Sequence, residues 1–257
     1  MTRAQALDRA ATHFEDGSFV SDLARLIACP TESQSPDARA TLTTYLTDVL
    51  PPLLDPLGVQ MQLFENPDPA GGPFLVAERI EDPALPTVFS YGHGDVIRAQ
   101  TDQWREGLTP FTLITEGDKL FGRGTADNKS QHLINILALR AVLETRGSLG
   151  FNLKLLIEMS EEVGSPGLNT FCQTHKDLLA SDVLIASDGP RLDAAVPTVF
   201  MGTRGAVNFD LTVNYREGAH HSGNWGGVLA DPGPRLIHAI SPICDAPGAL
   251  PIPGRRP

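Results

Sequence analysis

The segment PTVFSYGHGDVI (residues 86–97) begins as a continuous apolar run and ends in His93 and Asp95, with a single glycine between them. A short unbroken apolar run is typical of a strand that is buried on both faces. In an open α/β sheet, ligands bind outside the carboxyl ends of the strands, which is where His93 and Asp95 would lie. A histidine in a turn also has an ordinary structural explanation, so the other strand ends have to be compared with this one.

Strands and helices alternate on both sides of this segment. Further strands are predicted at 59–64, 73–80, 153–159 and 182–187, and helices at 2–28 (with a break near Gly17), 36–57, 128–146 and 165–179. The clearest helix, 128–146, should bury an apolar stripe formed by Leu133, Ile134, Ile136, Leu137 and Leu143. This alternation predicts an α/β fold with a mixed, mostly parallel sheet flanked by helices.

The pattern changes near residue 200. GAVNFDLTVNYRE (205–217) alternates apolar and polar residues, as a half-exposed strand of an antiparallel sheet does, and 234–243 is predicted to be a helix. We therefore expect two parts, residues 1–200 and residues 201–257, the second with α+β character.

The composition narrows the choice of partner and compartment. A formal net charge of −11 argues against nucleic acid and against anionic membranes, because both require basic patches. The three cysteines form no CxxC pair, the N-terminus lacks the apolar segment of a signal peptide, and no apolar run approaches the roughly 18–20 residues that cross a bilayer. We expect a soluble, cytoplasmic protein.

Acidic side chains follow the other strands at the same predicted edge of the sheet. Glu161 and Glu162 follow the strand at 153–159, Asp188 follows the strand at 182–187, and Asp127 lies in the loop before the long helix. Taken singly, Asp127 is explained as a helix N-cap and the two glutamates as a solvated turn. Together with His93, they form the histidine and carboxylate set of hydrolytic zinc, manganese or cobalt sites.

The spacing of these residues suggests separate roles. Two metals about 3.5–4 Å apart usually share a carboxylate, and Asp127 is the natural candidate because Gly122 and Gly124 allow a tight loop. Adjacent residues that leave a strand point in different directions, so one glutamate of the Glu161-Glu162 pair can bind a metal while the other acts as a general base. A second carboxylate, here that of Asp95, commonly orients a metal-binding imidazole.

The motifs, in this order, resemble the M20 metallopeptidases, a family that includes carboxypeptidase G2-like enzymes, aminoacylases, succinyl-diaminopimelate desuccinylases and carnosine dipeptidases. The resemblance covers roughly residues 15–255 and rests on GHGDVI (92–97), the spacer with Trp104, Pro110 and Phe111, KLFGRGTADNKSQ (119–131), EMSEEVGSPGL (158–168) and ASDG (186–189). It implies a catalytic domain over 1–200 and two divalent metal ions, zinc first, with manganese or cobalt as alternatives. It also implies a cis peptide bond between Asp127 and Asn128.

The resemblance assigns a role to each site residue. It makes His93 and Asp188 ligands of one metal, Asp127 the bridge, Glu162 a ligand of the second metal, Glu161 the general base and Asp95 the residue that orients His93.

Residues 201–257 resemble the start of the inserted lid, or dimerisation, domain of this family. AHHSGNWGGVLADP (219–232) is similar to the HSG…GG…P pattern of the dipeptidase branch and assigns His221 to the lid histidine. In dimeric members that histidine polarises the scissile carbonyl of the substrate in the partner subunit, so a homodimer is implied. A histidine in a surface loop is the alternative explanation.

The sequence departs from the family pattern in three respects. Ser130 stands where a glycine is common. The last metal ligand of the family, a histidine, is expected beyond residue 257, and so are the remaining lid strands and the closing part of the catalytic domain. The resemblance thus implies an N-terminal fragment of a longer hydrolase that cleaves a peptide bond in a small substrate, most simply a dipeptide. The alternatives are an N-acyl or N-carbamoyl amino acid amidohydrolase and a catalytically inactive truncated chain.

Overall fold

The computed structural model describes residues 2–189, 191, 193, 195–202, 205, 209–244 and 247. The chain divides into two compact units, Met1–Thr198 and Val199–Pro257. The first unit contains the sheet and the helices that cover it, and it holds all but one of the predicted site residues.

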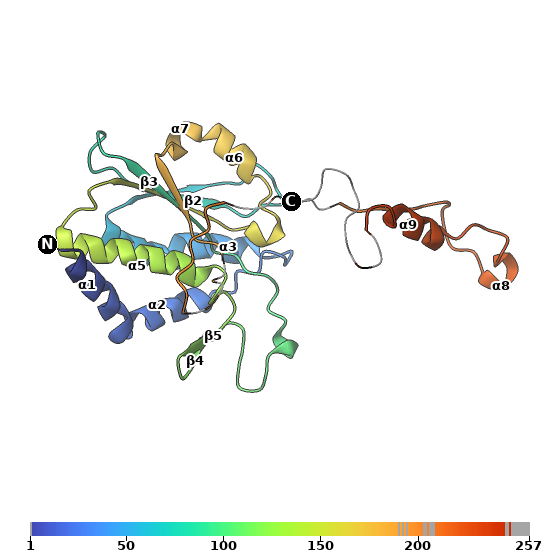
Figure 1. Ribbon diagram of the computed structural model, residues 1–257, viewed down its shortest axis with the longest axis horizontal. Coiled ribbons are helices and arrows are strands. Elements are labelled where there is room, and N and C mark those ends of the chain that lie inside the picture. Colours follow the sequence, from blue (N-terminus) through green and yellow to red (C-terminus); the bar gives the residue numbers. More distant parts are fainter. Residues whose placement is uncertain are drawn as a thin grey trace. The chain divides into compact units, whose positions relative to one another are not determined.

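Five strands form the main sheet of the first unit (Figure 1), in the order β1 (Gln60–Phe64), β2 (Phe74–Arg79), β6 (Asn152–Glu158), β3 (Thr87–His93) and β7 (Val183–Ala186). β2 is antiparallel to β1 and to β6, whereas β3 is parallel to β6 and to β7. Every strand except β2 therefore runs in the same direction, which confirms the mixed, mostly parallel sheet. A separate hairpin pairs β4 (Ile114–Glu116) with β5 (Lys119–Phe121).

The strand register brings the predicted site residues to one edge of the sheet. His93 pairs with Glu158, so β3 and β6 end side by side, and the pairing of Tyr91 with Ala186 ends β7 close to them. The loops that follow these three strands carry Asp95, Glu161, Glu162 and Asp188, whereas Asp127 lies in the loop between β5 and α5. The sequence argument from carboxyl ends of strands is therefore correct.

Helices cover both faces of the sheet (Figure 1). One face is covered by α1 (Arg3–Glu15), α2 (Ser18–Ile27), α3 (Arg39–Thr44), the π-helical turn Tyr45–Val49, α4 (Pro51–Leu54), the 3-10 turn Asp55–Leu57 and α5 (Lys129–Arg146). The opposite face is covered by α6 (Leu168–Thr174) and α7 (Lys176–Leu179). Two short 3-10 turns, Thr101–Gln103 and Glu161–Val163, lie in loops.

Alternating strand residues supply two separate cores. Leu155 and Ile157 of β6 belong to the larger cluster with α2 and α5, whereas Leu156 between them packs with Phe171 of α6. Each fully buried side chain of this size contributes about 1.5–3 kcal/mol relative to exposure. The sheet is thereby held from both sides.

The predicted stripe of α5 is wrong at one position. Leu133 and Ile136 are buried, but Ile134 is 53% exposed. Successive helical residues are about 100° apart, so a residue next to Leu133 turns away from the face that Leu133 and Ile136 share.

The second unit contains α8 (Ser222–Trp225) and α9 (Pro232–Ile240), and α9 confirms the helix predicted at 234–243. The strand predicted at 205–217 is not formed over residues 209–217, and residues 206–208 lie outside the described residues. A strand needs a neighbour for its backbone hydrogen bonds, and the described part of this unit contains no other strand. Within the described ranges, no helix combines the length and the apolar character that spanning a membrane would require.

Candidate metal centre

His93 is fully buried at the end of β3, and its ring is held from both nitrogens. Nδ1 lies 3.0 Å from the backbone carbonyl oxygen of Asp95 and 3.3 Å from Asp95 Oδ1. Nε2 faces the opposite way, 3.0 Å from Asp127 Oδ1. Gly94 allows this geometry, because a Cβ at that position would lie 2.5 Å from the Tyr45 ring. The Nδ1 contacts direct Nε2 toward the carboxylates.

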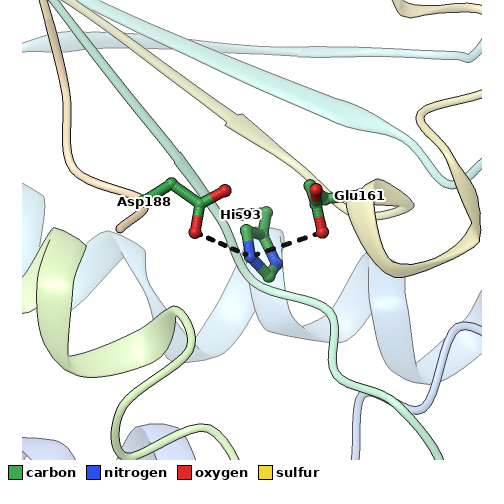
Figure 2. A group of neighbouring side chains, drawn as sticks. All are labelled: His93, Glu161 and Asp188. Carbon is green, nitrogen blue, oxygen red and sulfur yellow. Dashed lines mark ion pairs between the residues drawn. The ribbon is translucent and has the colours of Figure 1, made fainter. Parts of the chain in front are cut away.

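Carboxylates from three separate loops surround His93 Nε2. Besides Asp127, Asp188 Oδ1 lies 3.7 Å away and Glu161 Oε2 3.8 Å away, and Figure 2 shows these two side chains on opposite sides of the imidazole. Two sets of three side chains have ligand atoms within 4.8 Å of one another: His93, Glu161 and Asp188, and His93, Asp127 and Glu162. The structure thus brings together every site residue predicted in the first unit.

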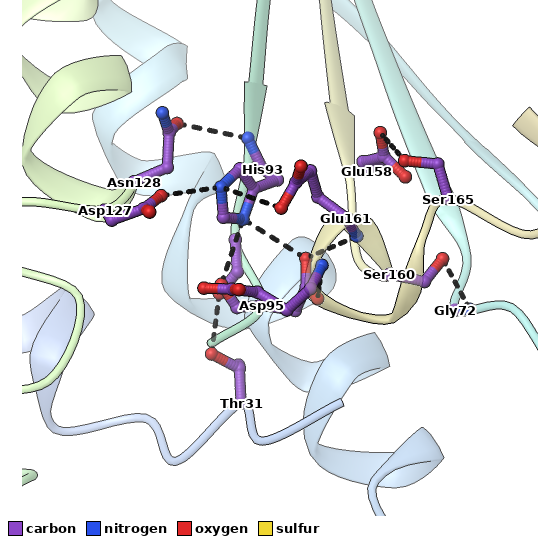
Figure 3. A network of polar contacts seen from close by, with 12 residues as sticks. Thr31, Gly72, His93, Asp95, Asp127, Asn128, Glu158, Ser160, Glu161 and Ser165 are labelled. Carbon is purple, nitrogen blue, oxygen red and sulfur yellow. Dashed lines mark hydrogen bonds and ion pairs between the residues drawn. The ribbon is translucent and has the colours of Figure 1, made fainter. Parts of the chain in front are cut away.

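Asp95 makes contacts that the sequence argument missed. Its buried carboxylate accepts hydrogen bonds from the backbone N–H groups of Glu161 and Glu162, each 3.1 Å long. Figure 3 shows the contact between Asp95 and Glu161. Those N–H groups begin a 3-10 turn, where backbone donors lack partners within the turn. An acidic residue at a neighbouring strand end was the only sequence signal for this contact.

The loop that carries Asp127 leads directly into α5. The peptide bond between Asp127 and Asn128 is cis, as the resemblance implies. The next residue, Lys129, is buried, and its Nζ donates to the carbonyl oxygens of Leu26 (2.8 Å) and Cys29 (2.7 Å). Ser130, which replaces the common glycine, donates its hydroxyl to the carbonyl oxygen of Thr125.

The ionisable groups of the site influence one another strongly. Burial lowers the pKa of His93, but hydrogen bonds to Asp127, Asp188 and Asp95 outweigh it and raise the pKa to about 12. Burial, reinforced by the charge of Asp127, raises the pKa of Glu162 to about 7. Burial likewise raises the pKa of Glu161, whereas the His93 hydrogen bond lowers the pKa of Asp127.

The donor set therefore has a large excess of negative charge around one imidazole. Several carboxylates in so small a space repel one another, and a multivalent cation relieves that repulsion. Imidazole nitrogen and carboxylate oxygen are ligands that zinc, manganese and cobalt accept, so these residues fit a divalent metal centre.

Comparison with known proteins agrees with this geometry. The sequence profile described as peptidase family M20/M25/M40 matches residues 89–230. The chain belongs to this peptidase family. The matched region contains all seven predicted site residues, from His93 to His221.

Relatives within the peptidase family include dipeptidases. The Beta-Ala-His dipeptidase of Mus musculus is 38% identical over 186 residues, which cover 71% of this chain and 37% of the relative. The Cys-Gly metallodipeptidase of Candida albicans is 30% identical over 254 residues, covering 92% of this chain and 51% of the relative. The crystal structure of human carnosine dipeptidase 1 matches 98% of this chain and 54% of its own chain, with a TM-score of 0.74 and 26% identity. The chain thus spans about half the length of these family members, or less.

His221 is the one predicted site residue of the second unit. It is exposed and stands at the N-cap of α8, where its Nδ1 accepts a hydrogen bond of 3.1 Å from the backbone N–H of Gly223. The neighbouring His220 ring packs edge-on against Trp225. A role for His221 in a peptidase lid therefore remains a prediction.

Proposed function

We propose that the protein is a metal-dependent dipeptidase with a dinuclear centre. The observation that carries the proposal is the convergence of carboxylates from separate loops on His93 Nε2, which lies 3.0 Å from Asp127 and 3.7 Å from Asp188. His93 and Asp188 would hold one cation, Asp127 would bridge, and Glu162 would hold the second. An imidazole nitrogen has one lone pair, so His93 can bind only one of the two cations. The resemblance implies that the histidine ligand of the second cation comes from later in the sequence.

When bound, such a pair of cations supplies Lewis acidity and lowers the pKa of a water molecule. Glu161 would act as general base: it takes the proton of the attacking water on a carboxylate oxygen and later delivers it to the leaving amine nitrogen. Burial raises the pKa of Glu161, which moves this carboxyl toward the working pH of such a base. Asp95 would hold His93 and the backbone of Glu161 in place.

The substrate class follows from the relatives. The mouse relative is named for Beta-Ala-His and the fungal relative for Cys-Gly, so short dipeptides with a free amino group are the first substrates to test. An N-acyl or N-carbamoyl amino acid would need the same proton transfers, and the inactive truncated chain would show neither activity.

We further infer the organisation of the whole protein. Residues 1–200 would form the catalytic domain, and residues 201–257 would begin a lid domain that mediates a homodimer and carries His221. Zinc is the first metal expected, with manganese and cobalt next. A cytoplasmic location is consistent with three cysteines that form no CxxC pair.

The test combines metal analysis with a substrate panel. The protein is loaded with zinc, manganese or cobalt, and hydrolysis of β-alanyl-histidine, cysteinyl-glycine, and N-acetyl and N-carbamoyl amino acids is followed by amine release. Dipeptide hydrolysis that is abolished by chelation and by Glu161→Ala supports the proposal. A protein that binds none of the three metals, or whose activity is indifferent to Glu161→Ala, contradicts it.

A further inference from the structure

Asn128 is the N-cap residue of α5, but its side chain does not cap the helix. It precedes α5, yet its side chain makes no capping hydrogen bond to the helix backbone, although asparagine is among the residues that most often do so. The side chain is fully buried and turns toward the sheet instead. A different role must therefore account for its contacts.

The amide of Asn128 joins two strand ends. Its Oδ1 accepts from the backbone N–H of His93 at 3.1 Å, a contact that Figure 3 shows. Its Nδ2 donates to the carbonyl oxygen of Ser187 at 2.6 Å and to Asp188 Oδ1 at 3.2 Å. The backbone N–H can only donate and the carbonyl can only accept, so these partners fix which way the amide points.

A fourth contact completes the environment of the amide. His132, one turn along α5, places Nδ1 3.3 Å from Asn128 Oδ1, and its Nε2 lies 2.8 Å from the hydroxyl of Tyr45. Burial lowers the pKa of His132 to about 3, so a neutral ring donates from Nδ1 to Asn128 and accepts from Tyr45. Both amide atoms of Asn128 are thus occupied. The partners of its Oδ1, the backbone of His93 and the ring of His132, are buried, so removing the amide would leave them unsatisfied.

Asp188 follows a strand that is only weakly restrained. It follows the short strand β7, whose Val183, Leu184 and Ile185 are 49%, 61% and 50% exposed, so packing restrains this strand weakly. The Asn128 side chain contacts Asp188 Oδ1 through Nδ2 and the His93 backbone through Oδ1, so one residue holds both.

We propose that Asn128 is a positioning residue that sets the placement of Asp188 relative to His93, and with it the affinity of the metal centre. The inference rests on the proposed function, because it assumes that His93 and Asp188 bind a cation together. Residues that hold metal ligands in this way typically change metal affinity by 10–100-fold when they are replaced.

The chain offers a matched control on the same helix. Asn135, two turns further along α5, donates from Nδ2 to the hydroxyl of Ser187 at 2.9 Å and to that of Ser90 at 3.4 Å. It is an amide of the same kind that binds the same loop residue, Ser187, through its hydroxyl rather than its carbonyl group. Replacing it therefore perturbs the helix–sheet contact while leaving the Asn128 amide intact.

The experiment compares Asn128→Leu with Asn135→Leu in the full chain. Zinc and manganese affinities are measured by calorimetry, and circular dichroism and thermal unfolding report the folded fraction. We expect Asn128→Leu to weaken metal binding by about 10–100-fold and Asn135→Leu to stay within about threefold of the wild type. A folded Asn128→Leu chain that binds like the wild type, or an equal loss in both variants, overturns the inference.

A measurement on the unaltered chain covers the case in which Asn128→Leu does not fold. With the asparagine side chains labelled with nitrogen-15, zinc addition should shift the Asn128 amide resonances and leave those of Asn135 nearly unchanged. Unmoved Asn128 resonances at saturating zinc overturn the inference. A wild-type chain that binds no metal contradicts the proposed function as well, whereas wild-type binding with a normal Asn128→Leu affinity contradicts this inference alone.

Discussion

The carboxylate of Asp95 accepts a hydrogen bond of 3.1 Å from the backbone N–H of Glu161, and its other oxygen accepts one from Glu162. The same residue contacts His93 Nδ1. A single buried side chain therefore connects a proposed metal ligand with the backbone of the proposed general base. Because Glu161 and Glu162 lie in one short turn, the Asp95 carboxylate fixes the backbone positions from which both of their side chains extend.

Asp95→Asn should impair catalysis more than substrate binding. Asparagine presents one oxygen and one NH2 group, so one of the two backbone N–H groups would face a donor instead of an acceptor. We expect kcat to fall by about 10–100-fold with KM changed by less than about threefold, as measured with a dipeptide substrate under saturating metal.

Asp82→Asn is the control for this prediction. Asp82 also accepts from a backbone N–H, that of Ala84 at 2.9 Å, but it lies in the turn before β3 rather than at the strand ends that carry the site. Its replacement should leave kcat within about twofold of the wild type. An Asp95→Asn enzyme with full kcat would show that the turn holds the two glutamates without this carboxylate.

Glu161→Gln and Glu162→Gln should impair the enzyme in different ways, the first through kcat and the second through zinc affinity. If Glu161 is the base, its amide cannot accept the proton of water, and kcat should fall by about 10²–10⁴-fold while zinc affinity stays within a few-fold. Glu162→Gln should instead weaken zinc binding, because a neutral amide oxygen is a poorer ligand than a carboxylate. Calorimetry and steady-state kinetics on both variants separate the roles, and an exchange of the two phenotypes would reverse the assignment.

Much of this site could be predicted because it depends on local signals. The apolar run before His93 identifies a buried strand, and the acidic residues follow other strands at the same edge. The rule that parallel strands end together then brings His93, Glu161 and Asp188 to one place, and Asp127 was predicted to join them from the loop before the long helix. No pairing of particular side chains was needed for that step.

The contacts of Asp95 and Asn128 could not be predicted in the same way. The bond from Asp95 to Glu161 depends on the register that sets His93 opposite Glu158, and sequence patterns do not determine register between separate strands. Asn128 is simply the first residue of the helix predicted at 128–146, and only the geometry of its loop turns the amide toward Ser187. The strand expected at 205–217 was predicted wrongly over 209–217 for a related reason, because an alternation of apolar and polar residues does not supply a partner strand.

His132 should make the fold sensitive to acid. Burial lowers the pKa of His132 to about 3 in the folded state, below the ordinary histidine value of 6.5, so the unfolded chain binds one more proton between these values. Its stabilising contribution is therefore present above pH 6.5 and is lost as the pH falls toward 3. Between pH 6 and pH 4, the free energy of unfolding should fall more steeply in the wild type than in His132→Gln, by about 1.4 kcal/mol per pH unit.

Urea unfolding at a series of pH values measures this slope. His220→Gln, which replaces an exposed histidine of the second unit, should leave the slope unchanged. Equal slopes in the wild type and in His132→Gln would show that His132 takes up its proton in the folded state.

Phe171→Ala should destabilise the smaller of the two cores. The Phe171 ring stacks on Phe74 with a centroid distance of 4.4 Å and meets Phe64 edge-on at 5.2 Å, and it is almost fully buried between α6 and the sheet. Removing a buried phenyl ring leaves a cavity and lowers the free energy of unfolding by about 3–5 kcal/mol, which urea unfolding measures. Phe14→Ala removes a ring that is 63% exposed and should cost less than about 1 kcal/mol. A loss in Phe171→Ala as small as that in Phe14→Ala would mean that the core under α6 relaxes to fill the space.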